Sequence, residues 1–412
     1  MSQAQRHDTP DASAPVRILY VHHGKGIGGA PLSLLFLIRS LDRARYAPTV
    51  LCLHESEAAD LFRREGIETI VLQGVSDFSH TNVLWYPWWQ FPKIIRRAIA
   101  IPFSIERMRK FLMSRAFDLV HLNTSTLLAC GIAAHRAGIP IVWHIREPLA
   151  QGYFGWRRAY VRSVIDRCAT RIVPICRYDG EQLRPTDRMR VVYNFVEFER
   201  FDRAVVGAAV RRELGIPAGA ALVTMLGGIN PIKGTEVFVR TALEMSGRDD
   251  VHFLIVGAGQ ARGLRAVVNG TFAYHRRVYA LAASAVRTVH FTGVRRDIPE
   301  VLAASTLVCF PSTVPHFARP AIEAMAMARP VIASDLGGPR ELVDHGHTGL
   351  LVVPGDAGAL AAAITDLLAD EARRTAMGEA GWQMAHERFD AARNTREIME
   401  VYEEALVATS LR

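Results

Sequence analysis

Short β-rich runs alternate with longer helix-like segments along most of the chain, and this alternation restricts the possible folds more than any other feature. Strands that alternate with helices form βαβ units, so the strands pair in parallel and helices cover both faces of the sheet. The alternation pauses near residues 195–215 and then resumes, which predicts an α/β protein with two Rossmann-like domains. The expected strands are 16–21, 48–53, 68–72, 118–122, 140–144 and 171–175 in the first half, and 221–226, 251–256, 288–291, 306–310, 330–333 and 349–353 in the second.

The length of 412 residues also favours more than one domain, because a single hydrophobic core rarely serves so long a chain. We expect an N-terminal domain over 15–200 and a C-terminal domain over 201–383. A C-terminal helix is expected over 384–412, because this segment is amphipathic and rich in helix formers. Residues 1–14 are polar throughout, so we expect a flexible tail rather than a secretory signal.

Residues 82–117 depart from the alternation, since they carry three tryptophans and three prolines inside the first half. Because Pro87, Pro92 and Pro102 interrupt this segment, we expect an insertion of short helices instead of one continuous helix. Its aromatic and basic side chains suit the interface of a lipid bilayer, and an aromatic cluster with solvated arginines is the alternative. The basic residues are Lys93, Arg96, Arg97, Arg107, Arg109, Lys110 and Arg115, against Glu106 alone.

The formal net charge of +8 excludes few partners by itself, since basic patches attract anionic membranes, nucleic acid or phosphorylated substrates alike. No run of about 18 uncharged apolar residues occurs, so we expect no membrane-spanning segment. The five cysteines are scattered without C-x-x-C spacing, which favours reduced, buried thiols. We therefore expect a cytoplasmic protein that can also bind peripherally at the inner face of the plasma membrane.

A glycine-rich turn follows the first expected strand, and it has two interpretations. Gly24, Gly26 and Gly29 satisfy the G-x-G-x-x-G pattern of dinucleotide-binding folds, which would suit an NAD-linked oxidoreductase. That pattern needs an acidic residue about 20 positions on, and the candidate Glu55 is somewhat far. Alternatively, Gly28 and Gly29 let backbone N–H groups approach an anionic or hydroxyl-rich ligand at a helix N-terminus.

The second half carries several motifs in register: LGGINPIKG (226–234), FLIVGAG (253–259), FTGVRRDIPEVLAASTLVCFPS (291–312) and FARPAIEAMAMARPVIASDLGGPRELVDHGHTGLLVVPGD (317–356). In order and spacing they resemble the C-terminal domain of family 4 glycosyltransferases. The first half agrees through GGAPLSLL, PIVWHIREP and VVYNFVE, in which Phe195 replaces the glycine usual in the family.

This resemblance implies a GT-B fold, with two Rossmann-like domains facing each other across a cleft. It implies transfer of a sugar from a nucleotide-diphosphate sugar to a hydroxyl, with retention of the anomeric configuration. The N-terminal domain would bind a saccharide, glycolipid or lipid-linked acceptor, and the C-terminal domain would bind the nucleotide sugar. No D-x-D pair and no zinc-like His/Cys spacing occurs, so we expect no metal, no cofactor and no nucleic-acid partner.

The resemblance also assigns donor-binding residues. Lys233 would neutralise the leaving diphosphate beside Gly227 and Gly228, and a solvated loop lysine is the alternative. Glu323, expected to open a helix, would accept both ribose hydroxyls, and a purely capping role at the helix N-terminus is the alternative. The pair Gly337 and Gly338 resembles a further backbone cradle near the donor, and a plain turn is the alternative.

In the first half, the resemblance places His144 beside the sugar at the reaction centre, and a structural histidine is the alternative. Its place at a strand end agrees, because parallel sheets bind ligands at the carboxyl ends of their strands. Arg146 would contact the acceptor or a phosphate, or would simply pair with Glu147.

Two positions depart from the family pattern. Gly228 stands where the family has an arginine, which removes one diphosphate cation. Pro315 stands where the first glutamate of the E-x7-E motif belongs, and His316 and Arg319 are the nearest polar substitutes. Loss of one charge-assisted contact weakens a site by about 1.5–3 kcal/mol. The departures therefore raise a second hypothesis, a catalytically degenerate subunit that binds a nucleotide sugar or a partner enzyme.

Overall fold

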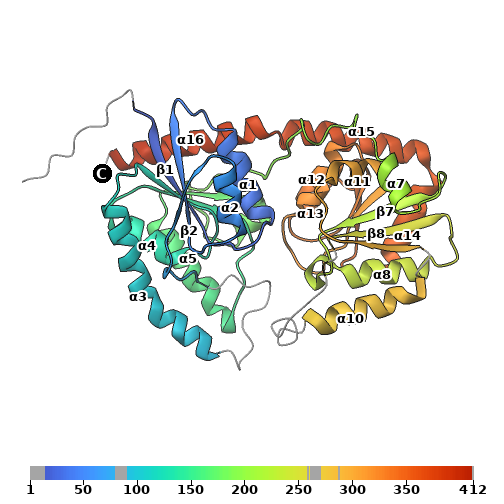
Figure 1. Ribbon diagram of the computed structural model, residues 1–412, viewed down its shortest axis with the longest axis horizontal. Coiled ribbons are helices and arrows are strands. Elements are labelled where there is room, and N and C mark those ends of the chain that lie inside the picture. Colours follow the sequence, from blue (N-terminus) through green and yellow to red (C-terminus); the bar gives the residue numbers. More distant parts are fainter. Residues whose placement is uncertain (1–13, 79–90, 258, 260–270, 286–287, 411–412) are drawn as a thin grey trace, which may run out of the picture.

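The computed structural model describes residues 14–78, 91–257, 259, 271–285 and 288–410. Within them the strands form two six-stranded parallel sheets, with orders β3-β2-β1-β4-β5-β6 and β12-β11-β10-β7-β8-β9. Both orders are those of a Rossmann fold, so the predicted α/β architecture is confirmed. Figure 1 shows the two halves side by side, each with helices around its sheet.

The strands of the first half are β1 Val16–His22, β2 Tyr46–Cys52, β3 Glu68–Val71, β4 Leu119–Leu122, β5 Ile141–Ile145 and β6 Arg171–Pro174. Those of the second half are β7 Ala221–Leu226, β8 Val251–Val256, β9 Val289–Thr292, β10 Leu307–Phe310, β11 Val331–Ser334 and β12 Gly349–Val352. Each expected strand is found, with its ends within about two residues of the prediction, because strands buried on both faces are continuous apolar runs.

The helices of the first half are α1 Gly29–Arg39, α2 Glu57–Arg64, α3 Phe91–Met113, α4 Leu128–Arg136, α5 Trp156–Cys168 and α6 Arg177–Glu181. The second half contains α7 Ala208–Glu213, α8 Thr235–Glu244, α10 Thr271–Ala282, α11 Ile298–Ala304, α12 Arg319–Ala326, α13 Pro339–Leu342, α14 Ala357–Ala369 and α15 Glu371–Arg388. The last helix is α16 Ala391–Ser410, and the 3₁₀ turns are η2 Tyr153–Gly155, η3 Pro231–Lys233 and η4 Ala283–Ala285.

Each sheet has a hydrophobic core on both faces. In the first half, Leu19 and Val21 of β1 pack with α3, α4 and α5, whereas Ile18 and Tyr20 pack with α1, α2 and α16. This alternation follows from the strand geometry, in which successive side chains point to opposite faces. The second sheet is covered in the same way, by α8, α10 and α14 on one face and by α7, α11, α12 and α15 on the other.

The C-terminal segment returns to the first half of the chain. A helix was expected from residue 384, but α15 continues to Arg388 and the chain turns before α16 begins at Ala391. The turn is stabilised by Asp390, whose carboxylate accepts a hydrogen bond of 2.8 Å from the backbone N–H of Arg393. Figure 1 shows α15 along the second domain and α16 along the first, so the C-terminal helix joins the N-terminal core.

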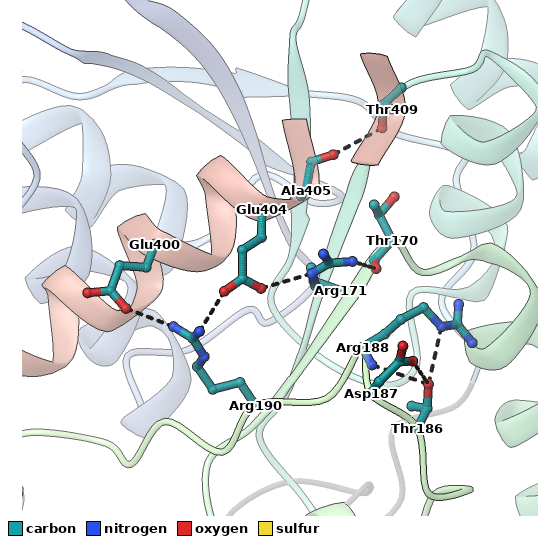
Figure 2. Close-up of polar contacts among 10 residues, drawn as sticks. All are labelled: Thr170, Arg171, Thr186, Asp187, Arg188, Arg190, Glu400, Glu404, Ala405 and Thr409. Carbon is teal, nitrogen blue, oxygen red and sulfur yellow. Dashed lines mark hydrogen bonds and ion pairs between the residues drawn. The ribbon is translucent and has the colours of Figure 1, made fainter. Parts of the chain in front are cut away.

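Ion pairs dock α16 beside strand β6 (Figure 2). Arg190 contacts Glu400 at 2.8 Å and Glu404 at 2.5 Å, and Arg171 of β6 contacts Glu404 at 3.0 Å. These side chains are partly exposed, so each pair contributes little alone, but the shared Glu404 sets the position of α16 along its axis.

In the described part of the segment expected to consist of short helices, one helix forms instead, α3 over Phe91–Met113, so that prediction is wrong there. Pro92 lies in the first turn, where a helix needs no N–H donor, and Pro102 lies inside the helix. An internal proline costs about 3 kcal/mol, but burial of a large apolar side chain contributes about 1.5–3 kcal/mol. The buried side chains of Ile105, Met108 and Leu112 therefore outweigh the proline. Pro87 and the three tryptophans lie outside the described residues.

All five cysteines lie in the described part of the chain and are free and buried, as predicted. Every helix within the described residues is too short or too polar to span a lipid bilayer.

Candidate active site between the two domains

In both sheets the first strand lies next to the fourth, β1 beside β4 and β7 beside β10. At such a switch point the loops that follow the two strands diverge and leave room for a ligand beyond the carboxyl edge of the sheet. The predicted glycines occupy these loops: Gly28 and Gly29 begin α1 after β1, and Gly227 and Gly228 follow β7. A Cβ at Gly28 or Gly29 would meet no atom within 4 Å, so the start of α1 is open.

Lys233 lies against the glycine turn that follows β7. A Cβ at Gly227, whose φ is +122°, would approach Lys233 Cδ to 2.5 Å and Nζ to 2.8 Å. Glycine is therefore required for the lysine to lie along the loop. Burial lowers the pKa of Lys233, and the negative charge of Glu323 raises it again. The ammonium thus faces the switch point of the C-terminal sheet, with Glu323 as its nearby anion.

Glu323 does not open a helix, in contrast to the prediction. Helix α12 begins at Arg319, so Glu323 lies in its second turn, beyond the free N–H groups that a capping carboxylate meets. Its Oε1 accepts a hydrogen bond of 2.9 Å from Arg319 Nε, and the two side chains are only 14% and 15% exposed. The capping alternative is therefore wrong, because the carboxylate is paired with the guanidinium of Arg319 instead.

Arg319 connects the two domains. Besides Glu323, its guanidinium donates a hydrogen bond of 2.7 Å to Ser33 Oγ on α1. It also lies over the ring of Phe36, 5.2 Å from the centroid. Arg319 was expected as a substitute for the missing glutamate, and here it links the proposed ribose-binding carboxylate to the helix that follows the first glycine loop.

The pair Gly337 and Gly338 packs against the loop that contains Pro315. A Cβ at Gly337 would lie 2.6 Å from Pro315 Cβ, and one at Gly338 would lie 2.9 Å from Phe317 Cα. His316, in the same loop, donates a hydrogen bond of 3.0 Å from Nδ1 to the carbonyl oxygen of Val314. Burial lowers the pKa of His316 to about 4, and its Nε2 has no partner among the described residues.

His144 lies near the carboxyl end of β5 in the first sheet and is only 4% exposed. Its Nδ1 lies 3.2 Å from His121 Nε2 and 3.4 Å from Arg146 Nη2, whereas its Nε2 has no partner within the described residues. Burial and the positive charge of Arg146 lower the pKa of His144 well below its usual value, so the imidazole is neutral.

Arg146 does not pair with Glu147, so that alternative is wrong for the described structure. Its Nε donates to Asn123 Oδ1 at 2.5 Å and its Nη1 donates to Asn194 Oδ1 at 2.8 Å. Glu147 instead accepts hydrogen bonds from the hydroxyls of Thr124 and Ser125. Burial lowers the pKa of Arg146 to about 9, which leaves it cationic at neutral pH.

Three polar residues at this edge were not identified from the sequence: His22, His121 and Asn123. Asn123 Nδ2 lies 3.3 Å from His22 Nδ1, so Arg146 contacts His144 directly and is linked to His22 through the amide of Asn123. Burial lowers the pKa of His22 to about 3. The sequence signal that could have identified these residues is their position at the ends of β1 and β4, two expected strands that pair with each other.

The contacts of Gly24 and Glu55 do not support the interpretation of the first glycine loop as a dinucleotide-binding site. A Cβ at Gly24 would lie 2.7 Å from His22 Nε2, so this glycine makes room for the histidine ring. Glu55, the expected ribose ligand, forms an ion pair with Arg63 and is 55% exposed. Across the described residues no cluster of three or more His, Cys, Asp or Glu side chains is arranged to hold a metal ion.

Two sequence families match consecutive parts of the chain. The family described as Glycosyltransferase Family 4 matches residues 27–200, and that described as Glycosyl transferases group 1 matches residues 220–370. A GDP-mannose-dependent alpha-mannosyltransferase of Mycolicibacterium smegmatis is 31% identical over 344 residues, which cover 76% of this chain and 84% of that protein. The chain belongs to glycosyltransferase family 4.

Other relatives of this family 4 glycosyltransferase match over a shorter stretch. A D-inositol 3-phosphate glycosyltransferase of Corynebacterium aurimucosum is 33% identical over 199 residues, 48% of this chain and 46% of that protein. One of Salinispora tropica is 32% identical over 244 residues, 56% of this chain and 48% of that protein. The matched stretches thus span about half the length of these relatives.

Solved structures share the fold of this family 4 glycosyltransferase. HepE of Anabaena, determined with UDP and glucose, has a TM-score of 0.76 at 22% identity and covers 94% of this chain and 99% of its own. Sucrose-phosphate synthase of Thermosynechococcus elongatus has a TM-score of 0.72 at 19% identity, covering 95% of this chain and 100% of its own. At these identities the likeness concerns the fold alone, and it confirms the predicted GT-B arrangement.

Proposed function

We propose that this protein is a retaining glycosyltransferase that moves a sugar from a nucleotide-diphosphate sugar to a hydroxyl of a saccharide, glycolipid or lipid-linked acceptor. One observation carries the proposal: Lys233 lies against Gly227 after β7, and the charge of Glu323 on α12 is near enough to raise the pKa of its ammonium. An ammonium there suits a diphosphate, and a carboxylate suits the two hydroxyls of a ribose. His144 and Arg146 lie at the corresponding edge of the other sheet.

The proposed chemistry needs positioning and charge more than it needs a protein base. Lys233 would stabilise the negative charge that develops on the diphosphate as the bond to the sugar breaks. The departing diphosphate would then accept the proton of the acceptor hydroxyl, which attacks from the same face. We propose that positive side chains serve this role without a metal cofactor. Turnover that is unchanged by EDTA is the expected result, and its loss on chelation would contradict this part of the proposal.

A second function, binding without catalysis, is favoured by one specific observation. Pro315 packs against Gly337, so its side chain supplies no polar contact to a sugar, and Gly228 supplies no cation. Arg319 is already engaged by Glu323 and Ser33. The site would then hold a nucleotide sugar with Lys233 and Glu323 but transfer it slowly or not at all.

A donor screen tests the proposed function. Purified protein is heated with UDP-, GDP-, ADP- and dTDP-sugars and with NAD, and the unfolding temperature is recorded. A ligand at 100 times its Kd stabilises by about 2.7 kcal/mol, which raises the Tm of a domain of this size by about 5–10 °C. We expect one class of nucleotide sugar to do so and NAD to have no effect. Release of nucleoside diphosphate with the stabilising donor supports transfer, and binding without turnover supports the degenerate subunit.

We further propose that α3 binds an anionic membrane surface. Phe91, Ile95, Ile99 and Phe103 recur every four residues on α3 and are exposed, Phe103 to 73%. They lie on a different face from the side chains that α3 buries against α4. Exposed basic residues of the same helix would contact lipid phosphates; they are Arg96, Arg107 and Lys110.

The double variant Ile99→Glu/Phe103→Glu tests this membrane proposal. It removes two exposed apolar side chains and adds two negative charges without touching the core face of α3. We expect its partitioning onto phosphatidylglycerol-containing vesicles in flotation assays to fall by about 10-fold or more. Val294→Glu is the matched control, because Val294 is an exposed apolar residue of the other domain. Equal flotation of the double variant and the control would contradict the proposal.

A further inference from the structure

Four buried rings form a hydrogen-bonded chain through the N-terminal domain. Tyr20 Oη lies 3.1 Å from Tyr402 Oη, and Tyr402 Oη lies 2.8 Å from His121 Nδ1. His121 Nε2 lies 3.2 Å from His144 Nδ1. The rings come from β1, α16, β4 and β5 in that order, so the chain starts on β1, passes through the C-terminal helix and ends on β5. His144 is its last member, and His144 Nε2 is buried without a partner among the described residues.

Arg146 determines the direction of these hydrogen bonds. Its guanidinium has only donors, and its Nη2 lies 3.4 Å from His144 Nδ1, so this ring nitrogen is the acceptor. His121 must then donate to it through Nε2–H. Burial keeps both imidazoles neutral, with pKa values well below the usual range, so each ring carries one proton. His121 Nδ1 is consequently an acceptor, and the hydroxyl of Tyr402 donates to it.

We propose that Tyr402 is a positioning residue: together with Arg146, and acting through His121, it holds His144 in the tautomer that carries its proton on Nε2. His144 thereby presents an N–H donor to an oxygen of the bound sugar, and it does not serve as a base. This inference rests on the proposed function, in which the leaving diphosphate takes the acceptor's proton and no protein base is required. The donor nitrogen is already desolvated and aimed by the chain, so its orientation costs nothing when the sugar binds.

The position of Tyr402 depends on the docking of α16. Glu400 and Glu404 flank it on the same helix, and both form ion pairs with Arg190 (Figure 2). Tyr402 also packs edge-to-face on Tyr46, with ring centroids 5.9 Å apart. The last helix of the chain therefore completes the site of the first domain, although it follows the whole second domain in sequence.

Nitrogen-15 NMR of histidine-labelled full-length protein tests the tautomer directly, without substrate. Protonated and unprotonated ring nitrogens differ strongly in chemical shift, and His121→Asn and His144→Asn variants assign the signals. We expect the proton on Nε2 in both rings of the wild type. A proton on Nδ1 of His144 would overturn the proposal, whether or not any donor sugar has been found. If no donor binds, the proposed function fails while the tautomer assignment still stands.

Three tyrosine variants separate hydrogen bonding from packing. Tyr402→Phe removes the donor to His121, so we expect an Nδ1–H population in the histidine spectra and a fall in kcat/KM of about 2- to 10-fold, the loss of one neutral hydrogen bond. Tyr20→Phe keeps that donor and should have a smaller effect in the same direction. Tyr46→Phe, in the same aromatic cluster but outside the chain, should leave tautomer and rate unchanged.

Two outcomes would overturn this assignment. A lower rate in Tyr402→Phe with unchanged histidine shifts would mean that the tyrosine acts through packing alone. A changed tautomer with an unchanged rate would mean that the N–H of His144 is not used. Unfolding temperatures of all three variants identify any general loss of stability, and Tyr20→Phe remains informative if Tyr402→Phe does not fold.

Discussion

Replacing Lys233 with alanine is expected to lower turnover by about 100- to 1,000-fold, the usual effect of removing one preorganised group that stabilises transition-state charge. The expected effect is large because this chain has Gly228 where the family motif has a second cation. Lys233 lies against Gly227 beside the end of β7, and Arg319 is held by Glu323 and Ser33. Turnover with the donor found in the thermal screen is the measurement.

The fold of the Lys233→Ala variant should be unaffected, because removing a buried ammonium whose pKa is lowered by burial relieves a desolvation cost. Arg240→Ala is the matched control, since Arg240 is an exposed cation on α8 with Glu236 as its partner. It removes the same charge outside the site and should retain full activity. A Lys233→Ala enzyme with wild-type turnover would refute the role of this lysine.

Replacing Glu323 with alanine is expected to weaken nucleoside diphosphate binding by about 100-fold in calorimetry. Two hydrogen bonds from ribose hydroxyls to a carboxylate, at about 1.5 kcal/mol each, would account for a change of this size. The carboxylate is preorganised for the task, because Arg319 holds it at 2.9 Å and both side chains are largely buried. Unchanged affinity would rule out the ribose contact.

A deoxynucleotide comparison isolates the ribose contact from the ion pair that the substitution also breaks. The wild type should bind the 2′-deoxy form of the nucleotide more weakly than the ribo form, and Glu323→Ala should not distinguish them. Arg319→Gln is the control: it removes the ion pair and the hydrogen bond to Ser33 but keeps the carboxylate. In that variant the penalty for the deoxynucleotide should persist, because the difference reports only the group that contacts the hydroxyl.

Local sequence rules failed where packing opposed them. Pro102 predicted a break in α3. The helix continues because Ile105, Met108 and Leu112, which follow the proline, bury their side chains in the core. Periodicity predicted one C-terminal helix from 384, and the chain instead turns at Asp390 to reach the other domain. A propensity is worth at most a few kcal/mol at one residue, so the burial of several side chains outweighs it.

The sequence by itself determined the two parallel sheets, the glycine turns after their first strands, and the motif that carries Lys233 and Glu323. These features are local, because a buried strand is an apolar run and a turn of positive φ needs glycine. Only the tertiary structure decided which side chains meet: Arg319 with Ser33 across the domains, and Tyr402 with His121 across 281 positions of sequence. Such contacts depend on the direction of side chains from separate elements, which spacing along one chain does not encode.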